Sequence, residues 1–161
     1  MPFTLDVLSR EGALWVREAS PSMLPLIRPG DELWLAPVSP RRISRGMLVA
    51  YEREGQLVVH RVIACDEAGI VAKGDALAAP DPVVPRDQVV ARVIALRRAT
   101  GRLVDLDAFP WPLINRLLGG LAFLACSLCR EGSRAARPPL LSRLVWKALR
   151  VPFYLARLLL R

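Results

Sequence analysis

Up to about residue 108 the chain repeats one pattern, in which short, valine-rich segments of alternating character are separated by residues that favour turns. Such alternation is typical of strands that bury one face, and consecutive strands joined by tight turns pair as antiparallel neighbours. We expect strands at residues 13–18, 32–37, 47–52, 56–65, 69–73 and 88–98, with hairpin turns at 54–55 and 67–69. The sequence therefore predicts a mainly β fold built on a compact, mostly antiparallel domain.

The composition changes at Phe109-Pro110-Trp111-Pro112, which marks a boundary. Residues 113–129 are apolar and favour a helix, residues 130–139 form a connector, and residues 140–161 resume a helical pattern. We therefore divide the chain into a β-rich domain at 1–108 and a C-terminal segment at 109–161 that contains a pair of hydrophobic or amphipathic helices.

The net charge of +8 comes almost entirely from the C-terminal residues 132–161, which hold seven basic side chains and no acidic one. The basic residues of 140–161 share one helical face and apolar residues lie elsewhere, as in helices that lie on an anionic membrane surface. We therefore expect a membrane surface as a partner, contacted through 113–161, and no nucleic acid. Two alternatives stay open: the helices pack on the β domain, or 113–129 spans the bilayer, although its uncharged part is shorter than the roughly 20 residues of a span.

One serine-centred box, Ser20-Pro21-Ser22-Met23-Leu24-Pro25, precedes the single histidine of the chain, His60, and two aspartates, Asp75 and Asp81. A serine hydroxyl needs a base to take its proton, and that base needs a third group to fix its tautomer and orientation. Histidine suits this role because an ordinary imidazole has a pKa of about 6.5. We expect Ser22 to be the nucleophile and His60 the base, with Asp75 or Asp81 orienting the imidazole.

The order of these blocks resembles that of the signal peptidase I superfamily: the serine box, then Gly30-Asp31, then Val59-His60-Arg61-Val62, then Lys73-Gly74-Asp75 with Asp81. The position of the base is occupied by a histidine, and in this respect the chain resembles the branch typified by the endoplasmic-reticulum and archaeal signal peptidases. The resemblance covers about residues 19–95. It implies a β fold shared with the self-cleaving repressors and a serine endopeptidase that removes signal or leader peptides without a cofactor.

The resemblance also assigns supporting roles around the nucleophile. It implies an oxyanion hole formed by the Ser22 backbone N–H and the Ser20 hydroxyl, with Met23 in a supporting position. A serine–lysine pair, as in the repressors, is the alternative chemistry, but Lys73 stands beside Gly74 in an expected turn. A catalytic lysine must be desolvated to be neutral near pH 7, which a turn position disfavours.

Simpler interpretations compete with catalysis. Ser22 could be a turn residue, His60 a structural strand residue, and either aspartate could hold a turn through its side chain. The alternatives for the whole chain are a non-catalytic peptide-docking or membrane-associated module on the same fold, and a self-cleaving regulator cut at Ala68-Gly69.

The three cysteines, Cys65, Cys126 and Cys129, do not predict a metal site, because the C-x-x-C pair lacks a second pair or a nearby histidine. Charged residues are spread through the 21 positions ahead of Ser22, so no signal peptide or membrane anchor is expected there. We therefore expect a membrane-associated protein whose peptidase domain lies on the cytoplasmic side.

Overall fold

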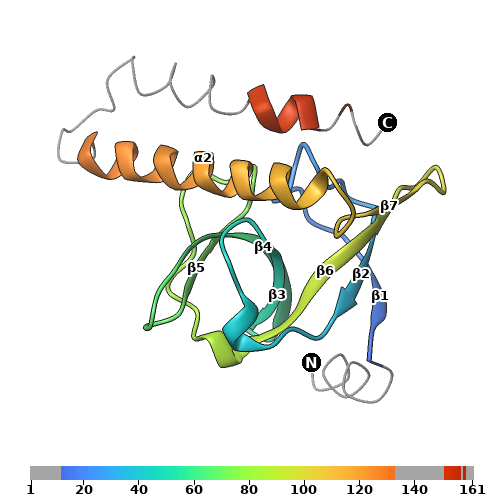
Figure 1. Ribbon diagram of the computed structural model, residues 1–161, viewed down its shortest axis with the longest axis horizontal. Coiled ribbons are helices and arrows are strands. Elements are labelled where there is room, and N and C mark those ends of the chain that lie inside the picture. The colour runs from blue at the N-terminus through green and yellow to red at the C-terminus, as the bar shows by residue number, and fades with distance from the viewer. Residues whose placement is uncertain (1–11, 133–150, 157, 159–161) are drawn as a thin grey trace.

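The structure, a computed structural model, describes residues 12–132, 151–156 and 158 (Figure 1). Its strands form one seven-stranded sheet. They are β1 (Leu14–Arg17), β2 (Glu32–Ala36), β3 (Leu48–Arg53), β4 (Gln56–Cys65), β5 (Ile70–Lys73), β6 (Val89–Arg97) and β7 (Leu103–Asp105). The strand order is β1-β2-β6-β3-β4-β5, with β7 also paired to β6, and the strand pairs are antiparallel. The predicted mainly β, antiparallel fold is confirmed.

Helical segments occur in two of the connections between strands and after the last strand. Two short 3-10 helices, η1 (Pro40–Arg42) and η2 (Arg86–Gln88), lie in loops, and α2 (Trp111–Gly132) follows the last strand. Residues 151–156 are also helical. The helix expected at 113–129 is longer at both ends in the structure. At its N-terminal end it includes Pro112, because proline is well tolerated in the first turn of a helix. Most of the expected connector and residues 140–150 lie outside the described residues.

Strand β7 was not expected from the sequence, because a three-residue strand is too short to display an alternating pattern. Among the described residues, no helix combines the length and the hydropathy needed to cross a membrane.

The larger of two hydrophobic cores lies between the sheet and α2, which runs along one side of the sheet in Figure 1. One face of α2 supplies Leu118, Ala122 and Cys126 to this core, at the four-residue spacing of a helix. Phe153 and Ala156, from the helical residues 151–156, are buried in the same core. Where they are described, both C-terminal helices therefore pack on the β domain.

Two facing glycines allow α2 to approach the sheet closely. A Cβ atom on Gly119 would lie 2.8 Å from the Cα of Gly46, and one on Gly46 would lie 2.5 Å from the Asn115 carbonyl oxygen. Gly46 also has a φ of 96°, which side chains with a Cβ rarely adopt. The first half of α2 is thereby seated directly on the turn that precedes β3.

Candidate active site

Ser22 lies in the turn between β1 and β2, and side chains that follow it in this turn are anchored in the core. The next residue, Met23, is 0% exposed and packs in the core together with Ile27. The Ile27 N–H also donates to the Met23 carbonyl at 3.0 Å. At the end of the turn, Asp31 forms a buried ion pair with Arg98. The supporting role expected for Met23 therefore corresponds to an anchor that fixes the backbone beside Ser22.

The Ser22 hydroxyl is paired with that of Ser20. The two Oγ atoms lie 2.9 Å apart, and the Ser22 backbone N–H points at the Ser20 Oγ at 3.3 Å. The Ser20 backbone N–H in turn donates to a carboxylate oxygen of Glu18 at 2.8 Å, and Glu18 is buried. The two donors expected for an oxyanion hole therefore lie next to each other at the nucleophile. Glu18 was not expected, because nothing in its local sequence separates it from other strand-end acids.

The Lys73-Gly74-Asp75 box packs against the backbone of the Ser22 turn. The Ala76 N–H donates to the Ser22 carbonyl at 2.8 Å. A Cβ atom on Gly74 would lie 2.8 Å from the same carbonyl oxygen, so only glycine leaves room for this contact. Two blocks that are far apart in the sequence thus hold each other in place at the candidate nucleophile.

His60 lies in the middle of β4, and its position in the sheet is fixed by the pairing of its Cα with that of Val49 on β3. The imidazole is 5% exposed. Its Nδ1 lies 2.5 Å from Oδ2 of Asp81, whose side chain is 6% exposed. Of the two aspartates expected near the imidazole, Asp81 is the one in contact with it. This contact fixes the ring orientation and leaves Nε2 as the nitrogen that can accept a proton.

Two further residues hold Asp81. The Tyr51 hydroxyl donates to Asp81 Oδ2 at 2.7 Å and lies 3.3 Å from His60 Nδ1, while Arg53 Nη1 donates to Oδ1 at 2.7 Å. Both residues belong to β3, two positions apart, so their side chains share one face of the sheet. Neither residue was among the site residues expected from the sequence. The signal that could have found them is the hairpin turn at 54–55, which fixes the β3–β4 register and places Tyr51 diagonally opposite His60.

The contacts of Asp81 set its charge state. Burial raises the pKa of the Asp81 carboxyl, but hydrogen bonds from His60 and Tyr51 and the positive charges of His60 and Arg53 outweigh it, so the pKa lies below its ordinary value. Burial, followed by the hydrogen bond to Asp81 and the negative charge of that residue, raises the pKa of Tyr51 above its ordinary value. Asp81 is therefore an anion and Tyr51 a neutral donor at neutral pH.

Asp75, the other aspartate expected as a possible partner of His60, pairs with Arg61 instead. Its two carboxylate oxygens accept hydrogen bonds from Nε and Nη2 of Arg61, both at 2.9 Å. The side chains are 0% and 1% exposed, and Arg61 Nη1 also donates to the Gly46 carbonyl and to Asn115 of α2. This network joins β4, the turn before β3 and α2. The contacts of Asp75 are thus those of a structural residue.

The burial of Lys73 differs from what its sequence context predicted. It is the last residue of β5, in agreement with the strand expected at 69–73, but it is 4% exposed, whereas its place beside an expected turn indicates a solvated side chain. Its Nζ donates to the Gly74 carbonyl at 3.1 Å. The expectation of a solvated side chain was wrong because the turn begins only after Lys73, which keeps the buried environment of β5.

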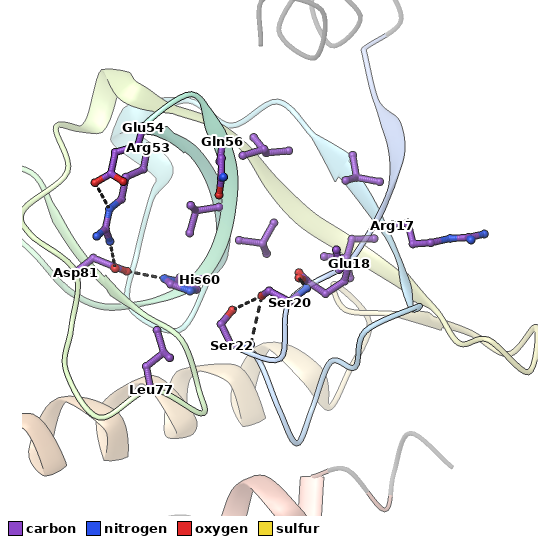
Figure 2. Close-up of a pocket in the computed structure, with 16 residues that line it drawn as sticks. Arg17, Glu18, Ser20, Ser22, Arg53, Glu54, Gln56, His60, Leu77 and Asp81 are labelled. Carbon is purple, nitrogen blue, oxygen red and sulfur yellow. Dashed lines mark hydrogen bonds and ion pairs between the residues drawn. The ribbon is translucent and has the colours of Figure 1, made fainter.

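Ser20, Ser22, His60 and Asp81 line one pocket of about 440 Å³. In Figure 2 the imidazole lies between Asp81 and the two serines. Within the described part of the chain no hydrogen bond joins Ser22 to His60, since the Ser22 hydroxyl is engaged with Ser20. Direct transfer of a proton from Ser22 to Nε2 requires the Ser22 hydroxyl to turn from Ser20 toward the imidazole.

The remainder of the pocket runs between β1 and the β3–β4 hairpin. Its apolar wall consists of Val16, Ala19, Leu33, Leu57, Val58, Val59 and Leu77. The polar lining in this part of the pocket comes from the end of β1 and from the β3–β4 hairpin, namely Arg17, Glu18, Arg53, Glu54 and Gln56. Such a pocket offers aliphatic contact close to the serine and polar contact at its rim.

The described residues contain no group of three or more histidine, cysteine or acidic side chains that could hold a metal ion. Cys126 is buried in the core and Cys65 is exposed at the end of β4, while the side chain of Cys129 lies outside the described residues.

Comparisons of the chain with protein-family models, with curated proteins and with solved structures found no match.

Proposed function

We propose that this chain is a serine endopeptidase in which Ser22 is the nucleophile, His60 the general base and Asp81 the residue that orients the base. One observation carries the proposal: Asp81 holds Nδ1 of His60 at 2.5 Å inside the pocket that also contains the Ser22 hydroxyl. The unexpected contacts of Tyr51 and Arg53 support it, because they fix the carboxylate that fixes the imidazole.

The reaction follows from these positions. The Ser22 Oγ attacks the carbonyl carbon of a peptide bond while its proton passes to Nε2 of His60, and the imidazolium is stabilised by the Asp81 carboxylate. The proposed donors to the tetrahedral oxyanion are the Ser22 N–H and the Ser20 hydroxyl, and this role requires the Ser20 side chain to release its contacts with the Ser22 N–H and hydroxyl. His60 then gives its proton to the leaving amine as the C–N bond breaks. Water, deprotonated by the same imidazole, hydrolyses the acyl ester and restores Ser22.

A signal or leader peptide is the proposed substrate. The aliphatic wall of the pocket suits small or aliphatic side chains next to the cleaved bond, and an Ala-x-Ala sequence is of this kind. The ordered blocks that resemble the signal peptidase I superfamily support the same substrate class. No cofactor enters the proposed reaction.

A non-catalytic peptide-docking module is the second candidate. The observation in its favour is that the Ser22 hydroxyl is bonded to Ser20 and not to His60. Docking alone gives no reason for an aspartate that Tyr51 and Arg53 hold against a histidine, so we favour catalysis. Self-cleavage at Ala68-Gly69 has less support, because that bond lies in the turn between β4 and β5 and outside the pocket.

The test is peptide cleavage followed by mass spectrometry. The purified chain is incubated with a library of Ala-x-Ala leader peptides, in parallel with Ser22→Ala, His60→Ala and Ser39→Ala. Ser39 is exposed and lies outside the pocket, so its variant controls for the loss of a hydroxyl. We expect cleavage by the wild type and by Ser39→Ala only.

The outcomes separate the candidates. Cleavage that survives Ser22→Ala would contradict the proposed nucleophile, and peptide binding without cleavage by the wild type would favour the docking module. A fragment cut between residues 68 and 69, formed on incubation without peptide, would indicate self-cleavage. Activity should also rise from acidic toward neutral pH, because only a neutral imidazole accepts the serine proton. A profile that is flat over that range would count against a histidine base.

A further inference from the structure

The side of α2 that faces away from the sheet is apolar and exposed. Leu113, Leu117 and Leu124 are 55%, 59% and 53% exposed. Their spacing of four and seven residues puts them on one side of the helix, opposite the buried Leu118 and Ala122. We call these three leucines the outer face of α2. A helix that is apolar on both sides is normally covered on both, so this face requires an apolar contact of its own.

A basic pocket lies beside the first half of α2. It has a volume of about 220 Å³, and its lining includes Arg45, Arg92 and Arg116. Arg92 is paired with Asp107 through two hydrogen bonds of 2.6 and 2.7 Å. Neither Arg45 nor Arg116 forms an ion pair with another described residue, and Arg45 stacks over the ring of Phe123 at 4.8 Å. The pocket therefore carries a surplus of positive charge next to the outer face of α2.

The last described helix adds a second apolar surface on the same side of the sheet as α2, as Figure 1 shows. Phe153 and Ala156 are turned into the core. The exposed side chains are Val151, Tyr154, Leu155 and Leu158, all between 50% and 58% exposed. A tyrosine among leucines suits a surface that is apolar but close to water.

We propose that the outer face of α2 and the neighbouring arginine pocket dock on an anionic membrane surface, with α2 lying in the plane of the interface and a lipid phosphate in the pocket. Charge complementarity between the arginine pocket and the anionic lipid headgroups favours a membrane as the occupant. Guanidinium groups bind phosphate with paired hydrogen bonds, and the leucines would enter the region of the acyl chains. The sequence between the two helices, residues 133–150, adds basic side chains and no acidic one.

A second copy of the chain fits this surface less well. A twofold contact over the outer face of α2 would place the positively charged pockets of both copies in or beside one interface with no opposite charge to neutralise them, and like charges at an interface weaken it. An anionic membrane offers negative phosphate groups to the arginines and, just beneath them, acyl chains to the leucines. The proposal does not depend on the activity of Ser22.

Vesicle sedimentation tests the proposal on the full chain. Vesicles of phosphatidylcholine are compared with vesicles that also contain phosphatidylglycerol, at low and high salt. We expect binding to the anionic vesicles and weaker binding at high salt. Leu117→Gln should reduce binding about tenfold or more, since a leucine side chain leaves the apolar phase. Val83→Gln is the control, because Val83 is 55% exposed and belongs to neither surface.

The arginine pocket has its own pair of variants. Arg116→Gln should weaken binding to anionic vesicles only, whereas Arg41→Gln, an exposed arginine of η1 outside this pocket, should change little. Circular dichroism confirms that each variant is folded. Equal binding of Leu117→Gln and wild type would overturn the proposal, as would equal binding to neutral and anionic vesicles. Loss of thermal stability in Leu117→Gln without loss of binding would assign the face to the chain itself. A concentration-dependent dimer that Leu117→Gln abolishes, without vesicle binding, would assign it to a second copy.

Discussion

Replacing Asp81 with asparagine is the sharpest test of the proposed active site. The change preserves the shape of the side chain but removes its charge and one of its two acceptor oxygens. Asp81 accepts hydrogen bonds from His60 at 2.5 Å, from Tyr51 at 2.7 Å and from Arg53 at 2.7 Å. An amide cannot accept all three. If its NH₂ group faces His60, the imidazole must carry its proton on Nε2, and that nitrogen can no longer take a proton from Ser22.

The magnitude follows from these contacts. An imidazole held in the wrong tautomer lowers kcat by about 10⁴-fold, equivalent to about 5.5 kcal/mol in the activation barrier. The fold loses less: the bond between the buried His60 and Asp81 side chains is worth about 1.5–3 kcal/mol as a charge-assisted hydrogen bond. The bond from Arg53 adds little, because its side chain is 45% exposed and screened by water.

Tyr51→Phe is the matched comparison. It removes one donor to Asp81 but leaves the carboxylate and its contact with His60 Nδ1 in place. We therefore expect a loss of about tenfold or less in kcat and about 1 kcal/mol in the free energy of unfolding. The assay is kcat for a fluorogenic leader peptide at a temperature where circular dichroism finds each variant folded. A folded Asp81→Asn that keeps more than about a tenth of the wild-type kcat would refute the reasoning.

Three further predictions concern stability. Alanine at Gly119 places a Cβ 2.8 Å from the backbone of the turn before β3 and should lower the free energy of unfolding by about 1–3 kcal/mol, whereas Gly120→Ala, with nothing within 4 Å, should leave it unchanged or raise it; urea unfolding measures both. Asp75→Asn should cost about 3–5 kcal/mol by leaving a buried guanidinium without its countercharge. An unchanged urea midpoint for this variant would contradict the structural role. Because the pKa of Asp81 is lowered in the folded protein, its stabilisation is complete above the ordinary carboxyl pKa of about 3.9 and is lost as the pH falls through the lowered value. The difference in Tm between wild type and Asp81→Asn should therefore shrink below about pH 4, and a difference that stays constant down to pH 2 would contradict the assignment.

Several features could be predicted from the sequence because they depend on neighbouring residues. Alternation in segments such as 56–65 predicted strands, since burial of one face of a strand imposes a period of two. The change at 109–112 located the start of the helical region, because proline is tolerated in the first turn of a helix and disrupts the middle of a strand. The order of Ser22 and His60 identified a candidate nucleophile and base.

Three residues have environments that were not predicted from local sequence patterns. Tyr51 and Arg53 look like ordinary strand residues, and Lys73 looks like the solvated end of a strand beside a turn. Their environments depend on which strands lie side by side: the β3–β4 register brings Tyr51 to His60, and the position of Lys73 at the end of β5 buries it. The hairpin turn at 54–55 indicates the register that brings Tyr51 near His60, but the burial of Lys73 depends on segments that are distant in the sequence.

The sequence by itself determined that this chain forms short antiparallel strands followed by an apolar helix, and it supplied one histidine and one serine box as candidates for chemistry. Only the tertiary structure decided between the two aspartates. Asp75 and Asp81 are six residues apart, yet one pairs with Arg61 and the other with His60. Adjacent strand residues point to opposite faces of a sheet, so His60 and Arg61 contact different residues of the loop that follows β5.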